Sequence, residues 1–383
     1  MSLYDLLVFG WGDLNERDAF VAALEDLLGE SGVPRLDVAV ITDVTTFPSY
    51  SQKRPTVCAC FRDASAAELS VVRSLRKARA PVIPIARPME RFEDFPEELQ
   101  LLNGAKLADD RATWPVTAAA VLEAIGLLRA QRRLFVSYRR DEAREAALQL
   151  HDQLAASGFQ VFVDTHAIRP GKVFQEQLWH SLCDSDVMLM LDTKTYFQRK
   201  WTREEFGRAQ SMGVNIFRLV FPTHTPNPAT QFTASHLLKT SDFDGDRLRA
   251  NVVDGLVAEI EKLRARGIAA RLMAMTGKLQ TEVEALGGRI DGAGAYRSLS
   301  LTLKDGTQVW AYPVIGVPTA PLLHDVARKA AAAQQKGPYL VYDHTGLAED
   351  WLDHLTWLDN TIAEVDFMRV SETAQVLARR AAP

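Results

Sequence analysis

Short apolar runs alternate with amphipathic helical patterns through the first two thirds of the chain. In residues 1–130 the apolar runs lie at residues 4–10 (YDLLVFG), 36–42 (LDVAVIT), 56–61 (TVCACF) and 81–86 (PVIPIA). Their content of Val, Ile and Leu is typical of buried strands, and helical patterns separate them, one with Ser65 as its N-cap. Such an alternation predicts a parallel sheet covered on both faces. We therefore expect an α/β domain over residues 1–130.

A second alternation of the same kind covers residues 131–266. Its strand patterns are RLFVSY (133–138), FQVFVD (159–164), DVMLMLD (186–192) and NIFRLVF (215–221). Helical patterns lie between them, and the compact order predicts a flavodoxin-like sandwich. The layout of residues 6–32 resembles that of residues 134–158. An internal duplication and the common βαβ plan both account for this likeness.

The pattern changes in residues 267–383. Period-two alternation surrounds Asp305 and Gly306, which is a strong hairpin signal. Helices and one further strand follow, so we expect an α+β domain, joined by a linker near residues 265–285. His344 and His354 lie in an acidic, aromatic segment that suits either a site or one apolar helix face. The latter is the simpler interpretation, and a sensor or partner role for this domain rests on position alone.

Composition restricts the class of protein. The net charge of −5 disfavours a general nucleic-acid binder, and no apolar run approaches the ~20 residues that span a bilayer. The three cysteines, Cys58, Cys60 and Cys183, are too few for a disulfide framework and indicate a reducing cytoplasm. We interpret them as core residues. No His or Cys spacing indicates a metal site, and we expect no metal and no cofactor.

Three motifs in the second block occur in a fixed order. They are LFVSYRRDE (134–142), VFVDTHAIRPGKVFQEQL (161–178) and DVMLMLDTKTYFQRKWTREEFGRA (186–209). Together they resemble a TIR (Toll/interleukin-1 receptor) domain, over about residues 132–265. The third motif contains W-x-x-x-E, with Trp201 four residues before Glu205, as in TIR domains of the bacterial NAD-cleaving type. The resemblance implies NAD⁺ as substrate and Glu205 as the catalytic residue. The adjacent Glu204 would point about 100° away on a helix.

The chemistry of NAD⁺ agrees with a single carboxylate. Nicotinamide is cationic in NAD⁺ and leaves as a neutral molecule, so its departure needs no proton donor, unlike that of an ordinary glycoside. One carboxylate beside the ribose can stabilise the oxocarbenium-like charge. Trp201 would form a wall of the pocket. The alternative interpretation of Glu205 is a solvated side chain on a helix surface.

Other candidates for substrate binding surround the strand ends. Arg139 and Arg140 follow the first strand of this block and could hold the diphosphate. The alternative is a solvent-exposed basic pair or an ion pair with Asp141 or Glu142. Further candidates are Tyr138, Phe162 and Asp164. For Ser137 and Tyr138 we favour a role in shaping the strand end. For Phe162 and Trp179 we favour a place in the core.

The loop after the second strand corresponds to the BB loop of TIR domains, through which they pack on one another and which gates the pocket. Its residues here are Ile168, Arg169, Pro170, Gly171 and Lys172. The resemblance implies self-association and activity that depends on assembly. The plainer interpretation is a surface turn at Pro170-Gly171.

Three functions remain as hypotheses. The first is a cytoplasmic NAD⁺ glycohydrolase, a regulated bacterial immune or toxin effector that forms nicotinamide and ADP-ribose or cyclic ADP-ribose. The second is a non-catalytic TIR scaffold or adaptor. The third is an enzyme similar to nucleoside deoxyribosyltransferases. The first block lacks the arginine pair and W-x-x-x-E, so we expect it to be a non-catalytic TIR-like or receiver-like domain. The flanking domains would bind an unknown trigger.

Overall fold

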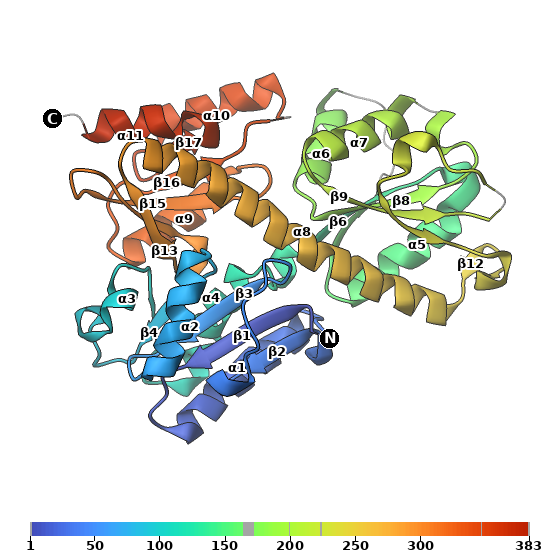
Figure 1. The fold of residues 1–383 in the computed structure, drawn as a ribbon. Coiled ribbons are helices and arrows are strands. Elements are labelled where there is room, and N and C mark those ends of the chain that lie inside the picture. Colours follow the sequence, from blue (N-terminus) through green and yellow to red (C-terminus); the bar gives the residue numbers. More distant parts are fainter. Residues whose placement is uncertain (1, 164–171, 199, 223, 346, 382–383) are drawn as a thin grey trace. The chain divides into compact units, whose positions relative to one another are not determined.

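The computed structural model describes residues 2–163, 172–198, 200–222, 224–345 and 347–381 (Figure 1). The chain divides into two compact units. Unit 2 contains residues Arg129–Ile268 together with Ser31–Val33, and unit 1 contains the rest. Residues 269–383 therefore belong to the same unit as the N-terminal sheet.

The N-terminal sheet of unit 1 is parallel and has the strand order β2-β1-β3-β4-β5. Its strands are β1 (Tyr4–Phe9), β2 (Val38–Ile41), β3 (Thr56–Cys60), β4 (Val82–Ala86) and β5 (Ala105–Lys106). The helices are α1 (Leu14–Glu30), α2 (Ala66–Lys77), α3 (Glu97–Gln100) and α4 (Trp114–Ala124). Strands β1, β3 and β4 are buried along their whole length, as their apolar runs predict. Ser65 caps α2 in a capping box with Glu68, which confirms the predicted N-cap.

The sheet of unit 2 is also parallel, with the order β10-β9-β8-β6-β7. Its strands are β6 (Arg133–Ser137), β7 (Gln160–Val163), β8 (Val187–Asp192), β9 (Asn215–Val220) and β10 (Ala234–Leu237). The helices are α5 (Arg140–Ala156), α6 (Lys172–Cys183), α7 (Lys200–Ser211) and the first part of α8 (Ala250–Ala285), and a short hairpin pairs β11 (Phe243–Asp244) with β12 (Arg247–Leu248). Numbered from its own first strand, this sheet has the same order as the N-terminal one. That order is the flavodoxin-like one.

The C-terminal sheet of unit 1 is mixed. Its strands, in spatial order, are β13 (Arg289–Ala293), β14 (Leu299–Thr302), β15 (Gln308–Val314), β16 (Tyr339–Tyr342) and β17 (Asp366–Arg369). The first three are antiparallel and the last three parallel. The helices are α9 (Ala320–Ala332), α10 (Glu349–Thr361) and α11 (Thr373–Ala381). Gly306 has φ 87° in the turn between β14 and β15, so the predicted hairpin is confirmed.

Specific contacts join the two sheets of unit 1. The Lys329 Nζ lies 2.6 Å from a carboxylate oxygen of Glu123, and Arg76 donates to the carbonyl of Asp291 at 2.8 Å. The predicted fold class, with an α/β, a flavodoxin-like and an α+β region in that order, is confirmed. The three-domain boundaries at residues 130/131 and 266/267 stay a prediction.

One predicted boundary was wrong, and another lies inside a helix. The linker predicted near residues 265–285 is part of α8, and the two units divide within that range, after Ile268. Met275, Leu279 and Val283 are buried beyond this point. The helix expected over residues 114–133 ends at Ala124, where Gly126 adopts φ 73°, a conformation that ends helices. No helix among the described residues combines the length and the apolar character needed to cross a membrane.

Candidate active site

The sheet of unit 2 has its topological switch point between β6 and β8. Chain connections leave these two neighbouring strands in opposite directions, and ligands of open α/β sheets bind in the crevice beyond the carboxyl ends there. Ser137 is the last residue of β6 and Asp192 the last of β8. The segment from β8 through Tyr196 to α7 continues from this edge. The W-x-x-x-E motif therefore begins its helix beside the switch point.

Glu205 lies in this region on α7 and is only 1% exposed. The Ser137 hydroxyl donates a hydrogen bond to its Oε2 at 2.5 Å, and the hydroxyl oxygens of Ser137 and Tyr196 lie 2.6 Å apart. Ser137 and Tyr196 are both 0% exposed. The interpretation of Glu205 as a solvated side chain is therefore wrong. Glu204 instead is partly exposed and lies 3.5 Å from Lys200, as the rotation of the helix predicts.

Apolar side chains surround this polar group. The cluster contains Phe135, Met188, Met190, Tyr196 and Phe206 among its buried members. The ring of Phe197 packs edge-on against Tyr196, with centroids 5.1 Å apart, and against Phe206 at 5.5 Å. A carboxylate in such surroundings interacts strongly with any charge that develops next to it, because the local dielectric is low.

Arg139 is engaged by neighbours within unit 2. Its Nη1 donates to the carbonyl of Thr195 at 3.1 Å, and its Nη2 lies 3.2 Å from Asp141. The ion pair weighed as the alternative for Arg139 is therefore present. Arg140 begins α5, and no ion pair or hydrogen bond joins it to another described residue.

Glu142 joins the same connection. Its Oε2 accepts a hydrogen bond from the backbone N–H of Thr195 at 3.2 Å. Burial alone would raise the pKa of Glu142, but hydrogen bonds from Thr193 and Thr195 and the charge of Arg139 outweigh it, and the pKa is lowered. An ionised Glu142 thus ties α5 to the segment that follows β8.

The remaining candidate residues that the structure describes have different surroundings. Tyr138 is buried in the apolar core of unit 2, which agrees with a role in shaping the strand end. Phe162 is 44% exposed, so its assignment to the core was wrong: β7 is an edge strand, and the side chain lies on a face that is left partly open. Trp179 packs under Arg208, whose guanidinium carbon lies 3.9 Å from the ring centroid.

Several candidates lie outside the described residues. These are Asp164, Ile168, Arg169, Pro170 and Gly171. Lys172 is the first residue of α6 and Trp201 the second of α7, but their side chains are outside the description too. Their proposed roles stay predictions.

Sequence reasoning missed two groups at this edge. Ser137 and Tyr196 were not predicted to contact Glu205; only the position of Ser137 at a strand end signalled it. Asp192 is fully buried. Its Oδ1 accepts a hydrogen bond from His224 Nε2 at 3.0 Å, and its Oδ2 lies 3.7 Å from Arg218 Nη1. Burial raises the pKa of Asp192, and the nearby His224 and Arg218 lower it only in part.

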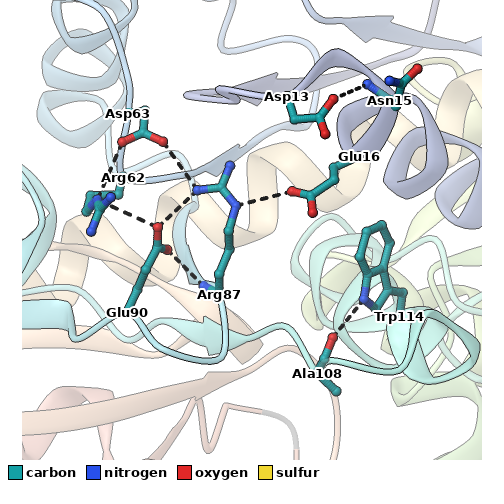
Figure 2. A network of polar contacts seen from close by, with 9 residues as sticks. All are labelled: Asp13, Asn15, Glu16, Arg62, Asp63, Arg87, Glu90, Ala108 and Trp114. Carbon is teal, nitrogen blue, oxygen red and sulfur yellow. Dashed lines mark hydrogen bonds and ion pairs between the residues drawn. The ribbon is translucent and has the colours of Figure 1, made fainter.

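The corresponding edge of the N-terminal sheet is occupied by its own side chains (Figure 2). Arg87, just after β4, pairs with Glu90 at 3.0 Å, Asp63 at 3.3 Å and Glu16 at 3.4 Å. Its guanidinium also lies over the ring of Trp11, 5.2 Å from the centroid. These contacts hold α1 and the loops after β3 and β4 together.

Among the described residues, no group of three or more His, Cys, Asp or Glu side chains is arranged to hold a metal ion. Cys58, Cys60 and Cys183 are buried, which confirms their place in the core.

Comparisons with known proteins assign a family to the middle of the chain. The family model described as TIR domain matches residues 134–252. No curated protein matches. Among 27 matching chains of solved structures are the TIR domains of the activated Roq1 resistosome directly recognizing the pathogen effector XopQ. Identity to them is 15%, over 36% of this chain and 84% of that one, with a TM-score of 0.22.

Two further structures match more of the chain. One is a two-component system response regulator/GGDEF domain protein, with 14% identity over 67% of this chain and 98% of that one and a TM-score of 0.25. The other is the leucine binding protein LivK from Thermotoga maritima, with 10% identity, 81% and 97% coverage and a TM-score of 0.19. These low scores carry no argument about function. The family match and the three motifs do identify the middle region: residues 134–252 are a TIR domain.

Proposed function

We propose that this protein is an NAD⁺ glycohydrolase whose catalytic residue is Glu205. The observation that carries the proposal is the position of its carboxylate: beside the switch point of the TIR sheet, in an apolar cluster, and held by the Ser137 hydroxyl. A buried carboxylate in a cytoplasmic TIR domain suits the stabilisation of a cationic sugar.

The reaction needs little else from the protein. The bond between ribose C1′ and the nicotinamide nitrogen breaks, and its electron pair leaves with nicotinamide, which becomes neutral. The Glu205 carboxylate stabilises the positive charge on the ribose by contacting its hydroxyls. Water then bonds to C1′ and releases a proton, giving ADP-ribose. Attack by an adenine nitrogen would instead give the cyclic product.

Arg140 is the better of the two arginines for the diphosphate. Arg139 would first have to leave the Thr195 carbonyl and Asp141. Arg140 lies one residue further, at the start of α5, where the helix dipole also favours an anion. Trp201, Phe162, Tyr138 and Asp164 remain proposed contacts of the substrate.

The burial of Glu205 supports a regulated enzyme. At 1% exposure, the carboxylate can meet a ribose only after neighbouring side chains move. Self-association through the loop at Ile168–Lys172 would supply such a change, and a trigger bound by the flanking regions would start it. We therefore place the protein among assembly-activated immune effectors, acting in antiphage defence through nucleotide signalling.

The test is NAD⁺ loss and nicotinamide release, followed by chromatography at low and high protein concentration and with a crowding agent. Wild type is compared with Glu205→Gln and with Glu204→Gln as the matched control, since Glu204 is partly exposed and pairs only with Lys200 among the contacts described. We expect activity that rises steeply with concentration, is unchanged in Glu204→Gln, and falls at least about 100-fold in Glu205→Gln. Equal activity of wild type and Glu205→Gln would refute the assignment.

The same burial also favours a second candidate, a TIR scaffold in which Glu205 only supports the fold. It predicts no NAD⁺ consumption at any concentration by a folded protein. A third enzyme class, similar to nucleoside deoxyribosyltransferases, would act on free nucleosides, so these are included as substrates in the assay.

A further inference from the structure

Three hydrogen bonds, together with the residues that they connect, form a closed ring that includes Glu205. Thr202 and Glu205 lie three residues apart on α7 and therefore on one face of the helix. The Thr202 hydroxyl donates to the carbonyl oxygen of Tyr196, the Tyr196 hydroxyl meets that of Ser137, and Ser137 donates to Glu205. The ring thus starts and ends on α7 and passes through the segment after β8 and the last residue of β6.

The members of this ring are nearly sealed from solvent. Ser137 and Tyr196 are 0% exposed, Glu205 1% and Thr202 3%. A glutamate side chain has three rotatable bonds, and fixing them costs conformational free energy. A hydroxyl-to-carboxylate contact of 2.5 Å lies in the range of charge-assisted hydrogen bonds, which are the strong ones. This contact can therefore hold the carboxylate in one rotamer.

A purely structural role for the members of this ring would not require side chains that form hydrogen bonds. Buried polar networks contribute less to stability than well-packed apolar groups of the same volume, and the apolar cluster around the ring is already extensive. What such a network does supply is a single defined geometry. Here the network defines the position of the Glu205 carboxylate at the switch point.

We propose that Ser137 and Tyr196 are positioning residues for Glu205, with Ser137 acting directly and Tyr196 through Ser137. The inference rests on the proposed function. In NAD⁺ cleavage the carboxylate must be aimed at the ribose before positive charge develops, so a loosened side chain lowers the rate of the chemical step. Substrate affinity, which other contacts determine, changes little.

The experiment measures kcat and KM for NAD⁺ in the full-length protein under the activating condition. The variants are Ser137→Ala, Ser137→Thr, which keeps the hydroxyl, and Tyr196→Phe, which loses only the terminal hydroxyl. Ser185→Ala is the matched control: Ser185 is also 0% exposed and donates to the carbonyl of Ser181 at 2.6 Å, within the same unit. Glu205→Gln serves as the reference for lost catalysis, and thermal unfolding monitors the fold.

We expect kcat to fall about 10-fold in Ser137→Ala and about 3-fold in Tyr196→Phe, with KM within 2-fold, and Ser137→Thr to recover at least half of the loss.

Contrary outcomes separate the two proposals. If Ser137→Ala and Tyr196→Phe match Ser185→Ala in kcat while Glu205→Gln is inactive, the positioning role is wrong and the proposed function stands. An increase of kcat in Ser137→Ala would overturn positioning too. If Glu205→Gln retains activity, the proposed function itself fails. Should Ser137→Ala not fold, Tyr196→Phe alone decides, since it removes only the hydroxyl oxygen and leaves the packing of the aromatic side chain in place.

Discussion

The two parallel sheets of this protein have the same strand order but different chemistry at their carboxyl edges. In the TIR sheet, the buried carboxylate of Glu205 accepts a hydrogen bond from the Ser137 hydroxyl beside apolar rings, and Asp192 pairs with His224 at the same edge. At the N-terminal sheet, two cations, Arg62 and Arg87, pair with the carboxylates of Glu16, Asp63 and Glu90 (Figure 2). The first arrangement holds a buried carboxylate through a hydroxyl group. The second uses its charges to join loops of the protein to one another.

Strand topology alone therefore does not create a ligand-binding site. Both switch points are places where ligands bind in α/β sheets, yet the side chains beside them differ: a hydroxyl holds a buried carboxylate at one, and ion pairs join loops at the other. The contrast agrees with the expectation that residues 1–130 are non-catalytic, which stays a prediction. It also leaves both explanations of the shared strand order open, a duplication or the common βαβ plan.

The largest expected effect comes from breaking the N-terminal network. Arg87→Met removes the cation that Glu16, Asp63 and Glu90 share and leaves only Arg62 beside Asp63 and Glu90, and we expect a loss of about 1–2 kcal/mol in unfolding free energy, or roughly 2–8 °C in thermal midpoint. Scanning calorimetry measures it. Arg91→Met is the control, because Arg91 and its partner Glu93 are both largely exposed, and it should change stability by less than about 0.5 kcal/mol. Equal midpoints for the two variants would contradict the structural role of Arg87.

The second prediction has the opposite sign. Glu205→Gln removes a buried charge but keeps an oxygen that can accept from Ser137, so the thermal midpoint should stay unchanged or rise, by about 1 kcal/mol at most. The same protein samples used for the NAD⁺ assay provide the measurement. A midpoint that drops as far as that of Arg87→Met would mean that Glu205 is a structural residue, and the contrast between the two edges would be lost.

The smallest effect concerns pH and Asp192, the last residue of β8. Its pKa in the folded protein is raised by burial above the ordinary 3.8, although His224 and Arg218 oppose this. The stability that it contributes is therefore fully present below pH 3.8 and is lost as the pH rises through the folded-state value. Asp192→Asn should flatten this decline in the thermal midpoint above pH 3.8. The exposed Asp152→Asn should retain the wild-type slope, and an unchanged slope in Asp192→Asn would exclude this origin.

Much of the fold was predictable because local patterns determine it. The buried strands β1, β3 and β8 are continuous apolar runs, and α2 carries its own capping box. An error arose where a local signal was ambiguous. The pattern over residues 114–133 was interpreted as one helix, but the helix ends at Ala124, where Gly126 adopts φ 73°.

The candidate site was predictable only in part. Trp201 and Glu205 are neighbours in sequence, so a motif can reveal them. Ser137 contacts Glu205 across 68 positions, and no periodicity connects the two. Arg139 was proposed for its charge and its place after a strand end, and only the structure shows its partners in space, Thr195 and Asp141.

By itself, the sequence determined the α/β alternation, the TIR domain and the glutamate on its helix, because hydrophobic periodicity and short motifs act within a few turns of chain. Only the tertiary structure decided that Glu205 is buried beside Ser137 and Tyr196, that Phe162 is partly exposed, and that residues 269–383 join the N-terminal sheet in one unit. Burial and long-range hydrogen bonds depend on which strands become neighbours, and that is settled by packing the whole sheet.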